Sequence, residues 1–86
     1  MPRLSEFYGI VIYMYWRDHP PAHFHAVYGE DEALVRIHDG AIIAGSIPHT
    51  ARRLVEQWVD LHRTELLDNW NRAGRPEALL PIAPLR

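Results

Sequence analysis

Histidine, aspartate and arginine side chains are concentrated in one short segment, residues 17–25, which reads RDHPPAHFH. His23 and His25 are separated by one residue, and on a β-strand this spacing places both imidazoles on the same face, about 7 Å apart. A pair of imidazoles can act as general acid and general base in phosphodiester or acyl chemistry. We therefore take His23 and His25 as candidate catalytic residues, with Asp18 to orient one imidazole.

Chemistry on an anionic substrate also needs a cation that holds the anionic oxygen. All nine Lys and Arg residues of the chain are arginine, so this cation must be an arginine or a protonated histidine. Arg17 lies within the segment itself, and Arg36 is predicted on a neighbouring strand. Arg36 is our candidate for the residue that meets the anion.

A metal site is an alternative use of the same segment. His23 and His25 could both reach one ion, and His38 could supply a third nitrogen ligand across the strand pair. Asp18 or His19 could supply a fourth ligand from the loop. Such nitrogen and oxygen ligands suit a divalent metal such as Zn²⁺, Ni²⁺ or Fe²⁺, the one cofactor that we consider. The signal is weak, since no second motif such as HExxH accompanies the His-x-His pair.

Two interpretations without chemistry remain open. In the first, the histidines and Arg36 solvate the open face of a sheet, and Asp18 accepts backbone N–H groups in a turn. In the second, large amphipathic side chains form a protein interface, since Tyr and Trp are typical interface anchors. The side chains in question are Tyr13, Tyr15, Trp16, Tyr28 and Trp70. A proline-rich tail could also add an extended segment to a partner's sheet.

Composition places the chain among small globular proteins. Its 86 residues are 48% hydrophobic and 23% charged, which predicts a single domain with a modest core. The absence of cysteine excludes disulfides and thiolate zinc sites, and the net charge of −2 argues against direct nucleic-acid binding. No run approaches 18 apolar residues and the N-terminus does not read as a signal peptide, so we expect a cytoplasmic protein without a membrane span.

Four strands are predicted to position the segment. Runs of β-branched and aromatic residues, separated by turn signals such as Asp39-Gly40, indicate these strands. The predicted strands are residues 8–16, 23–28, 33–38 and 41–46, with residues 29–32 as a turn.

A long helix and an extended tail are predicted to follow the strands. Residues 48–73 have no Gly or Pro after the first position, and Gly74 is a natural C-terminal stop. The tail, residues 75–86, has three prolines, yet it is apolar enough to pack along the domain. The fold class is therefore α+β: a four-stranded antiparallel meander with one long C-terminal helix packed on one face and an extended Pro-rich tail.

The register of the second and third strands determines which way the histidines point. If residues 29–32 form the turn, an apolar face that includes Phe24 lies under the helix. The predicted pairs on the opposite, solvent-facing side are His25 with Arg36 and His23 with His38. A slip by one residue would instead turn His25 toward the helix.

The predicted helix carries a further histidine. His62 falls near the middle of its apolar arc and Glu65 at the edge of that arc. Either His62 is a buried, hydrogen-bonded side chain, or it joins a site between helix and sheet. For the second case we include His62 among the candidate catalytic residues.

Much of the chain resembles a known family. The segments FYGIVIYMYWRDHPPAHFHAVYGEDEALVRI, DG, LHRTELLDNW and PIAPL are similar to the bacterial domain of unknown function 4160 family, over nearly the whole chain. The usual form of the family has a spacer residue before Pro-Pro, which this chain lacks between His19 and Pro20. The positions carried over by the motif match are Asp18, His19, His23, His25, His62 and Glu65.

The resemblance implies a small prokaryotic cytoplasmic protein without an established activity. Family members are often encoded beside a second small protein of the domain of unknown function 2442 type, and such pairs are similar to toxin–antitoxin modules. The resemblance therefore implies a toxin-like component that an antitoxin-like partner neutralises. A homodimer is an assembly that the sequence leaves open.

Overall fold

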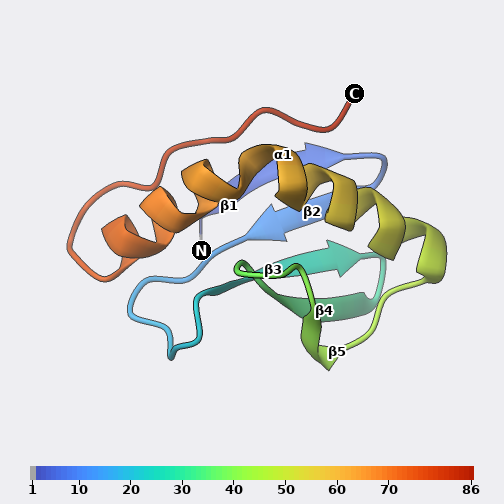
Figure 1. Ribbon diagram of the computed structural model, residues 1–86, viewed down its shortest axis with the longest axis horizontal. Helices are drawn as coiled ribbons and strands as arrows, with labels where there is room; N and C mark the ends of the chain where they lie inside the picture. The colour runs from blue at the N-terminus through green and yellow to red at the C-terminus, as the bar shows by residue number, and fades with distance from the viewer. Residues whose placement is uncertain (1) are drawn as a thin grey trace.

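Five strands follow one another across a single sheet in chain order, and the computed structural model describes residues 2–86. Each strand is antiparallel to its neighbour, so the sheet is a meander (Figure 1). The strands are β1 (Arg3–Phe7), β2 (Ile10–Tyr13), β3 (His23–Tyr28), β4 (Asp31–Arg36) and β5 (Ile42–Gly45). The helix α1 (His49–Ala73) covers one face of the sheet. The predicted α+β class with one C-terminal helix is thus confirmed.

The number of strands is the main difference from the prediction. The residues predicted as a first strand, 8–16, begin with a two-residue turn, Tyr8-Gly9, that joins β1 to β2. Both turn residues have positive φ, 50° and 80°, and glycine adopts this conformation without a steric penalty. The prediction of four strands is therefore wrong, because it reads this turn as strand and misses β1. Within residues 2–86, no helix has the length and apolar character needed to span a bilayer.

The turn between β3 and β4 is shorter than predicted. Tyr28 pairs with Asp31, so the turn consists of Gly29-Glu30 and not of residues 29–32. This change shifts the β3–β4 pairing by two residues. Because side chains alternate with a period of two, such a shift replaces the partners but leaves every side chain on its predicted face.

The predicted pairs between β3 and β4 are therefore wrong. His23 pairs with Arg36 and not with His38, and His25 pairs with Leu34 and not with Arg36. The one-residue slip that would turn His25 toward the helix does not occur.

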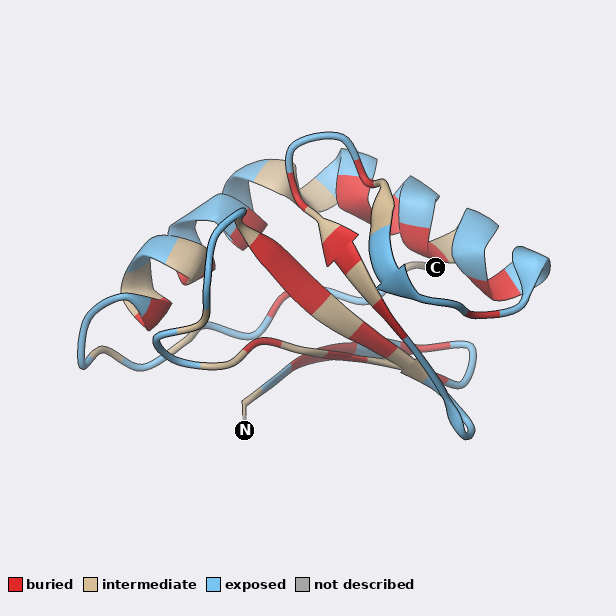
Figure 2. Ribbon diagram, turned by 90° about the horizontal axis from the view of Figure 1, so that it is seen from below, coloured by how far each residue is buried: buried red, intermediate tan, exposed pale blue. Residues whose placement is uncertain are grey.

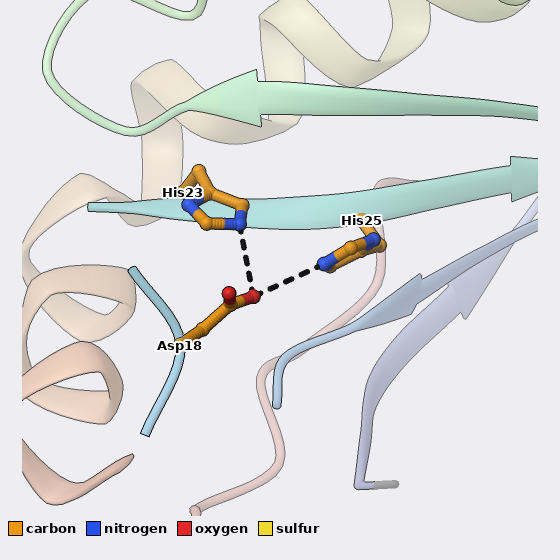
Figure 3. A group of neighbouring side chains, drawn as sticks. All are labelled: Asp18, His23 and His25. Carbon is orange, nitrogen blue, oxygen red and sulfur yellow. Dashed lines mark hydrogen bonds and ion pairs between the residues drawn. The ribbon is translucent and has the colours of Figure 1, made fainter. Parts of the chain in front are cut away.

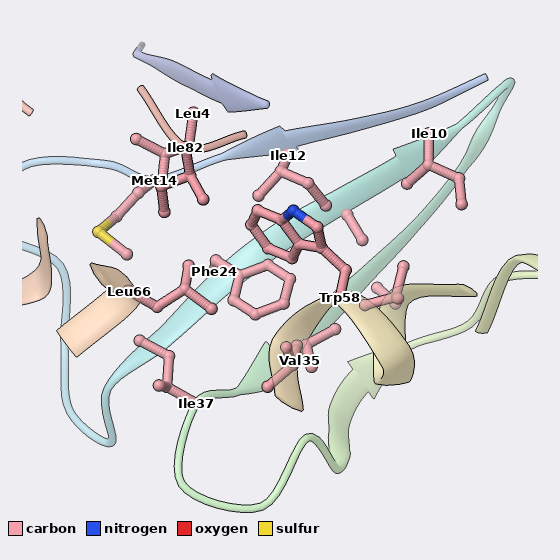
Figure 4. Packing of buried hydrophobic residues seen from close by; sticks show 14 of the residues in the cluster. Leu4, Ile10, Ile12, Met14, Phe24, Val35, Ile37, Trp58, Leu66 and Ile82 are labelled. Carbon is pink, nitrogen blue, oxygen red and sulfur yellow. The ribbon is translucent and has the colours of Figure 1, made fainter. Parts of the chain in front are cut away.

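The core lies between the sheet and α1, with Trp58 at its centre (Figure 4). The indole is fully buried and packs edge-on against Phe24, with the ring centroids 5.7 Å apart. It also packs against the ring of Phe7 in a tilted arrangement, with the ring centroids 5.3 Å apart. Figure 2 shows that the buried residues of α1 lie on the side that faces the sheet. Phe24 therefore sits beneath the helix, as predicted from the alternation of apolar and polar residues along β3.

The segment that follows α1 is extended and packs back along the domain (Figure 1). Ile82 is buried, and its N–H donates to the carbonyl of Leu4 at 2.8 Å, beside the edge strand β1. Asn69 of α1 is buried, and its side chain bonds both the N–H and the carbonyl of Leu80, at 2.7 and 2.8 Å. The tail therefore closes one side of the core.

Candidate functional site

Asp18, His23 and His25 converge in space, although they belong to two different elements (Figure 3). Asp18 lies in the loop between β2 and β3, and the histidines occupy the first and third positions of β3. The Nε2 atoms of His23 and His25 lie 3.0 and 3.4 Å from the same oxygen, Asp18 Oδ2. Within residues 2–86 these three form the one group of potential metal ligands, and their ligand atoms lie within 4.8 Å of one another. We call this group the Asp18 cluster.

The other ring nitrogen of each histidine is also bonded. His23 Nδ1 lies 2.8 Å from the carbonyl oxygen of Pro21, which can only accept a hydrogen bond. His25 Nδ1 lies 2.8 Å from Oε2 of Glu32, a residue of β4. Both Nδ1 atoms therefore donate, and in a neutral ring the lone pair is left on Nε2. These two lone pairs point at the Asp18 carboxylate.

Asp18 is held in its charged form. Burial alone would raise the pKa of Asp18. The pKa is instead lowered below its ordinary value by the hydrogen bond from the backbone N–H of His19, by the hydrogen bond that His25 donates when it is protonated, and by the positive charge of both imidazoles in that form. The N–H of His19 donates to Oδ1 at 2.8 Å, which leaves Oδ2 for the two imidazoles. Asp18 is thus both a turn residue that accepts a backbone N–H, as one sequence interpretation has it, and the centre of the cluster.

The two imidazoles are more sheltered than an open sheet face would allow. Their side chains are only 6% and 12% exposed. The ring of Trp70, from α1, lies 5.3 Å from that of His23, and the ring of Tyr15 meets that of His25 edge-on at 4.4 Å. The predicted face is correct, but the prediction that it is open to solvent is wrong, because aromatic side chains of the β2–β3 loop and of α1 pack over it.

A surface pocket of about 230 Å³ adjoins the cluster through Asp18. Its lining residues are Arg17, Asp18, Pro20, Trp70, Ala73 and Gly74. The backbone N–H of Arg17 donates to the carbonyl of Ala73 at 2.9 Å, which ties the loop to the end of α1. A cationic side chain, an aromatic ring and a carboxylate therefore meet at one small opening beside the two imidazoles.

Two of the predicted site residues on β4 and beyond do not join the cluster. Arg36 pairs with His23 through the backbone, but its guanidinium bonds both carboxylate oxygens of Asp39, at 3.0 and 2.6 Å. This pairing holds the pKa of Asp39 well below its ordinary value. His38 is exposed and is not among the three converging ligands. The structure therefore brings Asp18, and not His38, next to the potential ligand atoms of His23 and His25.

His62 lies on the helix side of the sheet and is not part of the group that His23 and His25 form with Asp18. Its Nδ1 lies 2.7 Å from Glu65 Oε1, and its ring packs against Trp58 at 5.6 Å between centroids. Backbone angles at His62, φ −126° and ψ 21°, interrupt the regular helix. Of the two predictions made for His62, the structure shows the hydrogen bond of the first, but the side chain is partly exposed, at 15%, and not buried. His19, the remaining histidine of the family motif, is exposed, and its backbone N–H donates to Asp18.

The residues of the cluster lie within a segment that matches a known family. Residues 9–71 match the Domain of unknown function (DUF4160). This match covers well over half of the 86 residues. The chain belongs to the DUF4160 family. A search of curated proteins and a search of solved structures each found no match.

The matched region of this DUF4160 protein contains the entire cluster and both aromatic residues that cover it. Strand β1 and the extended tail lie outside the match, which ends at residue 71. The elements that form and cover the cluster thus belong to the family region, whereas β1 and the tail complete the core around Trp58.

Sequence reasoning missed Glu32 and the Pro21 carbonyl, which hold the two Nδ1 atoms. The missed signal for Glu32 is the turn length. With the two-residue turn Gly29-Glu30, Glu32 becomes a strand residue on the same face as His25 and diagonal to it. No pattern in the sequence indicates the role of the Pro21 carbonyl, because that role depends on the conformation of the loop.

Proposed function

We propose that this DUF4160 protein is the toxin-like component of a two-gene bacterial module and acts on an anionic substrate at the Asp18 cluster. An antitoxin-like partner, of the domain of unknown function 2442 type, would neutralise it in the cytoplasm. The observation that carries the chemical part is the convergence of two imidazoles on one carboxylate oxygen, at 3.0 and 3.4 Å. The gene-pair part is supported by the family resemblance.

The hydrogen-bond network around the cluster supports a chemical role. It runs from Glu32 through His25 to Asp18, and from Asp18 through His23 to the Pro21 carbonyl. Catalytic groups need fixed orientation, and here each imidazole has a polar partner near both of its nitrogens. A side chain that only solvated a sheet face would need no such set of partners.

The pocket beside the cluster supports an anionic substrate. Arg17 and Asp18 both line it, so an anion held there by the Arg17 guanidinium would lie next to the cluster. Arg36 would first have to leave Asp39, to which it is bonded at two positions. We therefore place Arg17, and not Arg36, in the role of the anion-binding residue.

The test is growth on induced expression of the chain in a bacterial host. We expect the wild-type chain to arrest growth, and His25→Ala and Asp18→Asn to restore it, with expression levels checked by immunoblot. His38→Ala is the matched control, since this histidine is exposed and outside the cluster. Co-expression of the neighbouring gene product should relieve the arrest. If wild type and His25→Ala are equally harmless in the absence of any partner, the proposal is wrong.

A second candidate function is a non-enzymatic protein-binding module. The observation that favours it is a set of exposed large apolar side chains, which are Tyr8, Trp16, Tyr28, Ile43, Leu61, Leu67 and Leu80. Leu61 of α1 is 68% exposed, so it is a suitable probe. This function predicts that Leu61→Ser abolishes capture of the neighbouring gene product, while His25→Ala leaves capture intact. Deletion of the tail is a poor test, because Ile82 is part of the core and the Leu80 backbone bonds the buried Asn69.

A further inference from the structure

Two neutral imidazoles would leave the Asp18 cluster with three lone-pair-bearing atoms that face one another. With both Nδ1 atoms donating, the Nε2 lone pairs of two neutral imidazoles face a carboxylate oxygen at 3.0 and 3.4 Å. Three electron-rich atoms at such separations repel one another unless protons or a metal ion lie between them. The sheltered position of both rings strengthens this repulsion, because water screens it less than at an open surface.

The separations fit a single metal ion. Two ligands bound tetrahedrally to Zn²⁺ at the usual bond lengths lie about 3.3 Å apart. The two Nε2–Oδ2 distances are 3.0 and 3.4 Å, and all three ligand atoms lie within 4.8 Å of one another. Binding would therefore need only small movements of side chains that the fold already brings together.

The groups behind the imidazoles are those that metal sites use. A metal-bound histidine usually donates its second ring nitrogen to a backbone carbonyl or a carboxylate, which fixes the ring and raises its basicity. His23 donates to the Pro21 carbonyl and His25 to Glu32. This second shell is an observation independent of the ligand spacing, and it points to the same centre.

We propose that Asp18, His23 and His25 bind one divalent transition-metal ion of the zinc type through Oδ2 and the two Nε2 atoms. Three protein ligands leave at least one coordination position open, as in catalytic sites and unlike closed structural sites. Asp18 also lines the pocket that contains Arg17, so the open position is available to a substrate oxygen held there. This catalytic use rests on the proposed function, whereas the affinity for the metal does not.

The test is a titration of the untagged chain, freed of metal by a chelator, with Co²⁺ as a visible probe and then with Zn²⁺. We expect one Co²⁺ per chain with visible absorption bands, and displacement by Zn²⁺. His25→Ala and Asp18→Asn should each weaken binding by about 100-fold or more, since loss of a mere second-shell partner already costs 10–100-fold. His38→Ala is the matched control and should bind as wild type does.

Circular dichroism establishes that each variant is folded, and Asp18→Asn keeps the size of the loop side chain if His25→Ala fails to fold. The proposal is overturned if fewer than about 0.2 equivalents of metal bind. It is equally overturned if Asp18→Asn binds as wild type does, or if His38→Ala weakens binding as much as His25→Ala. Growth arrest that requires His25 in a protein without metal affinity would sink the metal site and leave the proposed function. Metal affinity without growth arrest would contradict the proposed function and leave the metal site.

Discussion

The two faces of β3 are both sheltered from solvent, but they are sheltered in different ways. On the helix side, Phe24 and Ala26 are fully buried and pack against apolar neighbours, among them Trp58. On the other side, His23 and His25 are nearly buried, and each of their four ring nitrogens has a polar partner. One strand thus separates an apolar core from a polar network.

The difference lies in what each face contributes to folding. Apolar burial stabilises the fold by about 25 cal/mol per Å² and needs no particular partner. Burial of a polar group costs free energy unless every donor and acceptor is bonded. The polar face therefore offers little net stability for the number of groups it must position. Such an arrangement is expected where the polar residues serve to bind a ligand and not to stabilise the fold.

The largest effect that this comparison predicts is on the apolar face. Phe24→Ala should lower the free energy of unfolding by about 3–5 kcal/mol, because it leaves a cavity beside Trp58. Urea denaturation measures the loss. Val27→Ala is the matched control on the other face of the same strand, and it should cost about 1 kcal/mol because Val27 is partly exposed. Equal losses in the two variants would remove the distinction between the faces.

The alternation that separates the two faces could be predicted from the sequence, and the reason is physical. Strand side chains repeat every two residues, so the apolar residues of β3 and β4 specify the faces even when the predicted turn is too long. The residue pairs between β3 and β4 depend on the length of the turn that joins these strands. Because the predicted turn is two residues too long, the prediction places His38 opposite His23. Strand β1 was missed because its residues, RLSEF, mix polar and apolar positions at the edge of the sheet.

The convergence of Asp18 on the two histidines could not be predicted in the same way. The loop that carries Asp18 is held by contacts with α1, such as the bond between the Arg17 N–H and the Ala73 carbonyl. These partners are far apart in the sequence, and no local pattern encodes their approach. The residue types of the site, Asp18 among them, were therefore visible in the sequence, whereas the approach of both imidazoles to one oxygen of Asp18 and the aromatic cover were not.

Asn69 is a buried polar residue on the helix side and provides the second prediction. It is a polar side chain 1% exposed, in line on α1 with the buried Leu66 and Ala73. Asn69→Ala should cost about 2 kcal/mol, because both of its hydrogen bonds to Leu80 are lost. Chemical denaturation measures the cost. Leu67→Ala, at an exposed helix position, is the control; an Asn69 cost no larger than that of the control would show that the tail does not depend on this residue.

The third prediction concerns the polar face and uses affinity in place of stability. Glu32→Gln should weaken metal binding by about 10–100-fold, since the amide is a poorer acceptor for the Nδ1–H of His25. The free energy of unfolding should change by no more than about 0.5 kcal/mol, because Glu32 is largely exposed. Glu65→Gln removes the equivalent partner of His62 and should leave metal affinity unchanged. Isothermal titration with Zn²⁺ measures both variants, and equal effects would contradict a second-shell role for Glu32.

The smallest effect is expected at Asp39, which pairs with Arg36 where the polar side of the sheet reaches solvent. The guanidinium and the N–H of Ala41 lower the pKa of Asp39 in the folded chain. The unfolded chain therefore binds a proton at higher pH than the folded chain does. The stability that Asp39 contributes is thus present above its unfolded pKa of about 3.9 and is lost as the pH falls toward the lower folded value.

Unfolding free energies of wild type and Asp39→Asn between pH 2.5 and 6 measure this contribution. The two proteins should differ above pH 4 and approach each other below it, and the difference should also shrink in high salt because the pair is exposed. Such a result would show that the charge pair contributes to stability, and a small difference would show that this contribution is minor on the polar side of the sheet. If the two proteins were instead equally stable at every pH and salt concentration, the pairing with Arg36 would contribute nothing, and Asp39 would act only as a turn residue through its bond to the Ala41 N–H, which an asparagine oxygen also accepts.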